Sequence, residues 1–358
     1  MSDAPGRGGR ATVDRHGRIA RTCLLALVTL GCGAAEAPRP VAASPAAPTS
    51  SARPAPASPR LAPLRADERA LAAELRAEVH ALAAIGERSV RKRWELAEAA
   101  DRLALALEAS GYAVERQGVE HDDVVLLNLT VLVPPSAPGA RWLVVGAHYD
   151  SAEGSPGAND GATGAAALLA LARRLRGASP TIGLRLALFA GSRGPLAGTP
   201  AMGSLVHARE LQGRGERLVG MVALESLGYF DPSASAQRPL PGSPLALPPS
   251  GDFVVVAGDT ASAELVSTVA GALLGQATLP IERATSDAAA RWLERTDAWA
   301  FRQVGVPAVA ISDGGALRDP HHGGPGDTAE RLDYERLART VAGLQRALLT
   351  IAGATPAD

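Results

Sequence analysis

Residues 141–175, which decide the fold, read RWLVVGAHYDSAEGSPGANDGATGAAALLALARRL. Positions 141–147 form an apolar run of strand length, and positions 162–175 form an Ala- and Leu-rich stretch of helix length. The polar loop between them contains three glycines, which are typical of tight turns. We therefore predict a strand, a loop and a helix that follow one another in an α/β unit.

Similar patterns recur on both sides of this unit. The apolar runs predict strands at 124–133, 184–190, 218–224, 253–257 and 306–311, and helical spacing predicts helices at 67–85, 94–107 and 261–274. Because the strands are apolar throughout and alternate with helices, they predict a sheet that helices bury on both faces. The segment 232–251 is rich in Pro, Gly and Ser and is expected to be a long surface loop.

The composition limits the kinds of function that this chain can have. Its 358 residues include 36 Lys and Arg against 37 Asp and Glu, and this balance argues against a nucleic-acid binder, which needs a basic surface. Aromatic residues make up only 3% of the chain, so Ala, Leu and Val must build the core. The two cysteines, Cys23 and Cys32, are too few for a disulfide scaffold or a zinc finger.

The N-terminus has the pattern of an export signal. Residues 1–21 contain five Arg, and the apolar run 23–30 that follows is far shorter than the ~20 residues of a membrane span. The run ends at Gly31-Cys32, which resembles the lipobox of bacterial lipoproteins.

We predict a signal peptide over 1–32, a tether of Ala, Pro and Ser over 33–63, and a single domain over 64–354. A lipidated Cys32 would anchor the protein to a membrane in the periplasm or cell envelope. The alternative is an ordinary signal peptide, cleaved near Ala34 or Ala35, and a secreted protein.

Polar side chains follow the strand at 141–147. His148 and Asp150, two residues apart, suit a metal ligand and a carboxylate that orients it. Asp160 precedes the helix at 162–175, where the helix dipole favours its negative charge. In such sheets ligands bind at the carboxyl ends of the strands. A buried histidine and a helix cap would explain each residue taken singly, but together they predict a metal site.

Six short segments follow one another along the chain: VGAHYDS (145–151), PGANDG (156–161), MGS (202–204), LESLGY (224–229), GVPA (305–308) and DT (327–328). In this order and spacing they resemble the zinc-dependent exopeptidases that include the bacterial dizinc aminopeptidases, with glutaminyl cyclases and the transferrin-receptor ectodomain as relatives. The resemblance covers residues 79–348. It implies a three-layer α/β sandwich with a mixed, mostly parallel central sheet, and a metallo-aminopeptidase that takes peptides or small amine-bearing ligands.

In this family two zinc ions share a bridging aspartate. By resemblance the first metal takes His148, Asp160 as the bridge, and Glu225, and all three are present. The second metal takes a glutamate that directly follows the general-base glutamate, at the end of the next strand. Here Ser192 stands at the general-base position and Arg193 at the ligand position.

The histidine of the second metal is also missing. The family places it four residues before the aspartate of Asp-Thr, a position that Gly323 occupies in this sequence. His322 lies one residue away and His321 two, so a shifted loop could still supply an imidazole. Both missing ligands belong to the same metal, which favours the loss of that metal.

These replacements change the chemistry that the site can perform. Serine cannot take the proton of a metal-activated water near neutral pH, and arginine is always protonated. At about 4 Å and an effective dielectric near 20, each pair of unit charges is worth roughly 4 kcal/mol. We hypothesise that the Arg193 guanidinium replaces one zinc and pairs with Asp160 and Glu225. The site would then hold at most one zinc ion, or none, in a catalytically impaired or inactive peptidase homologue.

Two other functions stay open. One is an active aminopeptidase that uses a single zinc and His322. The other is a serine hydrolase, because residues 190–194 (AGSRG) resemble a nucleophile elbow around Ser192. Its triad would need His321 or His322 together with Asp313 or Asp327. Pro195 and Gly198, however, argue against the helix that must follow such an elbow.

The remaining polar residues have simpler interpretations. Asp297 matches a family segment that usually reads Ser-Asp-His, and Asp313 is expected to hold a turn. His80, His121 and His207 are expected to be solvated residues of helix or loop surfaces.

Overall fold

The computed structural model describes residues 61–239, 247–292 and 296–354, all of which belong to one unit of the chain. The predicted signal peptide at 1–32 and residues 33–60 of the predicted tether lie outside the described residues, so both stay predictions. No helix in the described ranges is long and apolar enough to cross a membrane.

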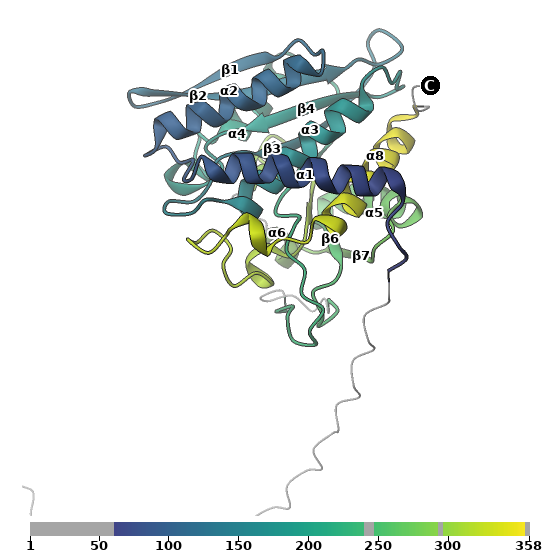
Figure 1. Ribbon diagram of the computed structural model, residues 1–358. Helices are drawn as coiled ribbons and strands as arrows, with labels where there is room; N and C mark the ends of the chain where they lie inside the picture. The colour runs from purple at the N-terminus through teal and green to yellow at the C-terminus, as the bar shows by residue number, and fades with distance from the viewer. Residues whose placement is uncertain (1–60, 240–246, 293–295, 355–358) are drawn as a thin grey trace, which may run out of the picture. The chain divides into compact units, whose positions relative to one another are not determined.

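In the described part of the chain, eight strands form one sheet (Figure 1). They are β1 (Glu115–His121), β2 (Val124–Val133), β3 (Trp142–His148), β4 (Gly183–Phe189), β5 (Leu218–Leu224), β6 (Val254–Gly258), β7 (Ile281–Thr285) and β8 (Ala308–Ser312). Their order is β1-β2-β4-β3-β5-β8-β6-β7, and the central strands β4, β3, β5 and β8 run parallel. The pairs β1–β2, β2–β4 and β6–β8 are antiparallel, whereas β6–β7 is parallel. The sheet is therefore mixed and mostly parallel, which confirms the predicted fold class.

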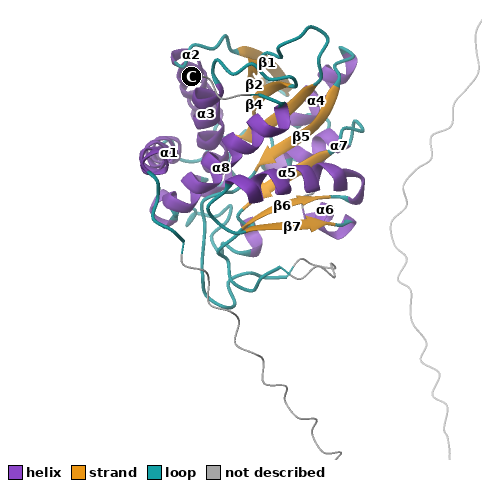
Figure 2. Ribbon diagram, turned by 90° about the vertical axis from the view of Figure 1, so that its right-hand side faces the viewer, coloured by secondary structure: helices purple, strands orange, loops and turns teal. Residues whose placement is uncertain are grey.

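Helices cover both faces of the sheet (Figure 2). One face packs against α1 (Ala66–Ala84), α2 (Arg93–Ala109), α3 (Thr163–Leu175), α5 (Ala263–Gln276) and α8 (Tyr334–Ala352). The other face packs against α4 (Gly203–Gly213), α6 (Asp287–Trp292) and α7 (Asp297–Arg302). The core of the first face consists almost entirely of Leu, Val and Ala side chains, as the composition predicts.

The two outermost strands, β1 and β7, are not predicted from the sequence. β1 reads ERQGVEH and buries one of its seven side chains, and β7 reads IERAT. Each has a single neighbouring strand and therefore keeps polar residues that face solvent. Hydrophobic runs identify strands that are buried on both faces, so these edge strands lack the signal.

The parallel central strands position the candidate site. Because β3, β4, β5 and β8 run in the same direction, their carboxyl ends lie at one edge of the sheet. The polar residues that follow these strands in the sequence are therefore brought together there.

His207 is buried, and the prediction that it is solvated is wrong. It lies on α4, whose inner side packs against the sheet, and its side-chain ring contacts that of Phe189 at a centroid distance of 5.5 Å. Its Nδ1 lies 3.2 Å from Oε1 of Gln117 on β1. Burial, together with the charges of Arg185 and Arg214, lowers the pKa of His207 to about 3.

We expect His207 to make the protein less stable in acid. An unfolded histidine has a pKa of about 6.5, so below that pH the unfolded chain binds a proton that the folded chain refuses. The free energy of unfolding therefore falls as the pH decreases from about 6.5 towards 3. Replacing His207 with Gln should reduce the loss between pH 7.5 and 5 by roughly 2 kcal/mol, measured by urea denaturation. His121→Gln, at a side chain that is 32% exposed, should keep the wild-type pH dependence. Equal pH dependence in His207→Gln and wild type would contradict the prediction.

Candidate functional site

The predicted site residues converge at the carboxyl edge of the sheet. His148 is the last residue of β3, Arg193 follows β4, and Glu225 follows β5 directly. Asp160 lies in the wide helical turn η1 (Ala158–Ala162), which leads into α3. The side chains of His148, Asp160 and Glu225 are at least nine-tenths buried.

The imidazole of His148 is oriented by Asp150 and faces two carboxylates. Its Nδ1 lies 3.0 Å from the Asp150 carbonyl oxygen and 3.3 Å from Asp150 Oδ1. Its Nε2 lies 3.4 Å from Asp160 Oδ1 and 3.7 Å from Glu225 Oε2. Burial and the charge of Arg193 act to lower the pKa of His148, but hydrogen bonds to Asp150 and Asp160 outweigh them and raise it to about 10. The imidazolium form thus pairs with the surrounding acids.

Arg193 lies between the two carboxylates. Its Nε donates to both carboxylate oxygens of Asp160 at 2.9 Å, and its Nη2 donates to Asp160 Oδ1 and, at 3.1 Å, to Glu225 Oε2. Its backbone N–H donates to Asp150 Oδ2 at 2.8 Å. Although burial acts to raise the pKa of Asp160, the Arg193 charge holds it well below its usual range. One guanidinium therefore contacts both acids that, by the resemblance, surround the family's metals.

The donor set suits one metal ion in the type of its ligand atoms, an imidazole nitrogen and carboxylate oxygens. Zinc bonds of about 2.0–2.2 Å in a tetrahedron separate neighbouring ligand atoms by about 3.3–3.6 Å. The distances from His148 Nε2 to Asp160 Oδ1 and Glu225 Oε2 are 3.4 and 3.7 Å. Yet both oxygens accept hydrogen bonds from Arg193, and no three His, Cys, Asp or Glu side chains in the described ranges form a group that could hold a metal as they stand. His148, Asp160 and Glu225 would hold an ion only if they exchanged their contacts with Arg193.

The second metal position lacks its family ligands. A Cβ atom added at Gly323 would lie 3.7 Å from Asp160 Oδ2, so this position faces the bridging aspartate as the resemblance implies. Gly323, however, has a φ of +66°, which disfavours other residues. His322 is brought to the same oxygen, with Nε2 at 3.7 Å, and its Nδ1 lies 3.4 Å from Ser226 Oγ. His321 instead lies against Gly326.

Ser192 is paired with Asp297, an acid for which the sequence predicts no role at the site. Its Oγ donates to Oδ1 of Asp297, the first residue of α7, at 2.6 Å, and both side chains are buried. Burial and the charge of Glu225 raise the pKa of Asp297 to about 6. The match of Asp297 to a family segment that usually reads Ser-Asp-His was the feature of the sequence that could have placed it at the site.

This pairing differs from the triad of the serine-hydrolase hypothesis. Ser192 contacts a carboxylate, whereas His322 contacts Ser226. A short 3₁₀ turn over Gly194–Leu196 follows Ser192, in place of the long helix that a nucleophile elbow requires.

A carboxylate network holds the turn that carries Asp160. Asp327 accepts hydrogen bonds from the backbone N–H groups of Asn159 at 2.6 Å and Asp160 at 3.0 Å. The Asn159 side chain donates to Asp313 Oδ2 at 2.9 Å. Asp313 also accepts from the backbone of Tyr229 and Gly315, which confirms its predicted role in holding turns.

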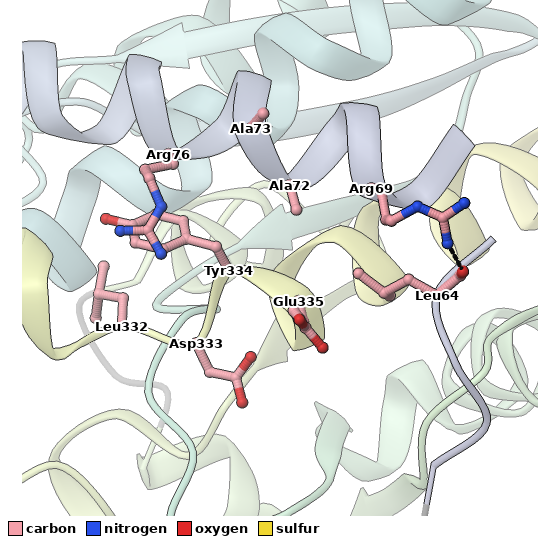
Figure 3. A pocket seen from close by; sticks show the side chains of 9 residues that line it. All are labelled: Leu64, Arg69, Ala72, Ala73, Arg76, Leu332, Asp333, Tyr334 and Glu335. Atoms are coloured by element: carbon pink, nitrogen blue, oxygen red, sulfur yellow. Dashed lines mark hydrogen bonds between the residues drawn. The ribbon is translucent and has the colours of Figure 1, made fainter. Parts of the chain in front are cut away.

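A pocket of about 440 Å³ lies elsewhere, between α1 and the start of α8 (Figure 3). Figure 3 shows Arg76 lying over the ring of Tyr334, with its guanidinium carbon 4.3 Å from the ring centroid. Asp333 and Glu335 line the other side. No residue of the candidate site lines this pocket.

Comparisons with known proteins agree with the geometry. The model of "Peptidase family M28" matches residues 128–347. The uncharacterized protein YfbL of Escherichia coli K12 is 35% identical over 211 residues, which are 56% of this chain and 64% of YfbL. The chain thus spans less than two thirds of the length of this relative.

Solved structures share the fold. The LapA aminopeptidase of Legionella pneumophila has a TM-score of 0.64 at 16% identity, over 80% of this chain and 74% of LapA. The glutaminyl cyclase of Porphyromonas gingivalis has a TM-score of 0.58 at 19% identity, over 78% of this chain and 98% of the cyclase. Because the family model matches most of the chain, these findings confirm the resemblance, and the chain belongs to peptidase family M28.

Proposed function

We propose that this protein is an M28 homologue in which the Arg193 guanidinium takes the place of the second metal, and that it binds peptides or small amine-bearing ligands without hydrolysing them. The observation that carries the proposal is the contact of Arg193 with both Asp160 and Glu225. The ligand class comes from the aminopeptidases that share the fold.

Electrostatics supports the loss of the second metal. A dication about 4 Å from a guanidinium would be repelled by about 8 kcal/mol at an effective dielectric near 20. Burial acts to lower the pKa of Arg193, but Asp160 and Glu225 raise it further above its ordinary high value, so the charge persists. A metal at this position would therefore have to displace Arg193 from its two carboxylates.

The replacement of the general base supports the loss of hydrolysis. A positioned proton acceptor contributes roughly 10²–10⁴-fold to such a rate. The Ser192 hydroxyl, which donates a hydrogen bond to Asp297, cannot replace a carboxylate in this role.

A single-zinc aminopeptidase is the second candidate, and the spacing around His148 favours it. His148, Asp160 and Glu225 would hold the ion, which would act as a Lewis acid. Asp297, which accepts the hydrogen bond of Ser192, then lies next to the general-base position.

Metal content and hydrolysis test the proposal together. We expect the purified full-length protein, equilibrated with zinc, to retain at most one equivalent per chain and to release no fluorescent amine from amino-acyl substrates. Any bound zinc should be lost in His148→Ala and kept in His121→Ala. Two equivalents of zinc would contradict the proposal. Hydrolysis that is abolished by Glu225→Ala would favour the single-zinc enzyme.

A further inference from the structure

Arg88 is a buried cation beneath the candidate site. It lies between α1 and α2, and its side chain is fully buried. The guanidinium donates hydrogen bonds only to backbone carbonyl oxygens among the described residues: Tyr149 at 2.8 Å, Leu82 at 3.1 Å, Gly86 at 3.0 Å, Pro156 at 2.6 Å and Gly157 at 2.9 Å. Such a set of converging carbonyls needs several donors in a fixed plane, which arginine supplies.

These contacts join the segment that carries His148 and Asp150 to the turn that carries Asp160. Tyr149 lies between His148 and Asp150, and Gly157 lies directly before the turn that carries Asp160. Arg88 thus holds both ends of the segment 149–157.

The backbone of Arg88 strengthens this junction. Its N–H donates to Ser151 Oγ at 2.9 Å, and its carbonyl accepts from the Ser151 N–H at 3.0 Å. The site segment is therefore fixed to the α1–α2 connection through main-chain and side-chain bonds together.

The charge of Arg88 has a second effect. Burial lowers its pKa to about 10, while the carboxylates of Asp150, Asp327 and Asp160 act in the opposite direction. Arg88 remains a cation at neutral pH and offsets part of the negative charge of the site.

We propose that Arg88 is a positioning residue that fixes Asp160 relative to His148 and Asp150. The inference builds on the site of the proposed function. Its readout does not depend on a bound metal, because Asp160 is also the acceptor of the Arg193 Nε–H.

The test follows the Arg193 Nε–H resonance in ¹⁵N NMR spectra of the full-length protein, assigned by its disappearance in Arg193→Met. In the wild type this proton should be protected from exchange by its bond to Asp160. Arg88→Lys keeps the charge but not the planar set of donors, so Asp160 should shift. We expect a changed chemical shift and exchange that is faster by about tenfold, the effect of weakening one hydrogen bond.

Arg339→Lys is the matched control. Arg339 on α8 is also buried, and its guanidinium donates to the carbonyl oxygens of Thr278 and Ala62. Neither residue belongs to the site. This variant should lose stability but keep the Arg193 resonance. If Arg88→Lys behaves as Arg339→Lys does, the proposal is overturned.

The proposal can also be tested if Arg88→Lys does not fold or if the wild type binds zinc. If Arg88→Lys does not fold, Ser151→Ala removes one bond of the same junction, and an unchanged Arg193 resonance in it would overturn the proposal. If the wild type holds one zinc ion in place of the Arg193 contact, zinc affinity replaces the Arg193 resonance as the readout. Arg88→Lys should then weaken zinc binding by about 10–100-fold, and Arg339→Lys should not. Equal zinc affinity in all three proteins would overturn the role of Arg88. The proposed function itself fails only if a second zinc ion binds or amino-acyl substrates are hydrolysed.

Discussion

Replacing Arg193 with methionine is expected to lower the free energy of unfolding in metal-free buffer by about 3–5 kcal/mol, and zinc is expected to restore most of this loss. The guanidinium is the partner of two buried carboxylates, Asp160 and Glu225. Without the guanidinium, the carboxylates of Asp160, Glu225 and Asp150 would share the single His148 imidazolium. A buried charge that loses its partner is strongly destabilising.

Zinc should compensate because the freed oxygens and His148 Nε2 are of the atom types that zinc binds, and the oxygens lie 3.4 and 3.7 Å from Nε2. At a concentration 100 times the dissociation constant, a bound ion stabilises by about 2.7 kcal/mol. Chemical denaturation with and without zinc measures the effect. The variant should gain at least about 1.4 kcal/mol more than the wild type, which corresponds to tenfold tighter binding.

Arg185→Met provides the control for this experiment. Arg185 lies on β4, is 5% exposed and pairs with Glu216, so its loss should also destabilise the protein. Zinc should not rescue this variant, because its carboxylate partner lies outside the site. A variant at Arg193 that is as stable as the wild type, or that zinc does not rescue, would show that the guanidinium is not a substitute for a metal.

The double variant Ser192→Glu/Arg193→Glu is expected to bind two zinc ions and to release amines from amino-acyl substrates at least about 100-fold faster than the wild type. The two glutamates recreate the general base and the missing ligand of the family pattern. A general base alone contributes roughly 10²–10⁴-fold. His322, with Nε2 at 3.7 Å from Asp160 Oδ2, is placed to supply the remaining imidazole.

Three related variants separate the contributions. Ser192→Glu alone keeps Arg193 and should stay inactive. Arg193→Glu alone should bind two zinc ions but hydrolyse slowly, since it lacks the base. Adding His322→Ala to the double variant should remove the second ion. Measured zinc content decides the matter: a double variant with no more zinc than the wild type would mean that the site has lost more than two residues.

The sequence predicts the centre of the fold well. The predicted ranges 124–133 and 218–224 coincide with β2 and β5. Most of their side chains are buried or half-buried, so an apolar run marks each strand from end to end. The residues just past the parallel strands β3 and β5 then had to meet, because parallel strands end at the same edge of the sheet. This reasoning brings His148 and Asp160 together from the sequence, and the family resemblance adds Glu225.

The same reasoning cannot find Arg88 or the pairing of Ser192 with Asp297. An arginine in a loop between two helices is usually solvated. Arg88 is buried because carbonyls 61–69 residues further along the chain converge on it. Ser192 and Asp297 are 105 residues apart, and their contact depends on how α7 packs against the sheet. Such contacts follow from tertiary packing, which leaves no local pattern.

The hydrogen bonds that Asp327 accepts from the turn before α3 affect how the protein matures. In a centre that is assembled around ions, the loops that carry the ligands take their final shape only when the metal arrives. Here a carboxylate fixes the backbone N–H groups of Asn159 and Asp160, and a guanidinium fills the space between the acids. If Arg193 takes the place of the metal as proposed, the chain reaches its finished form at any zinc supply, and metal scarcity does not limit the amount of folded protein.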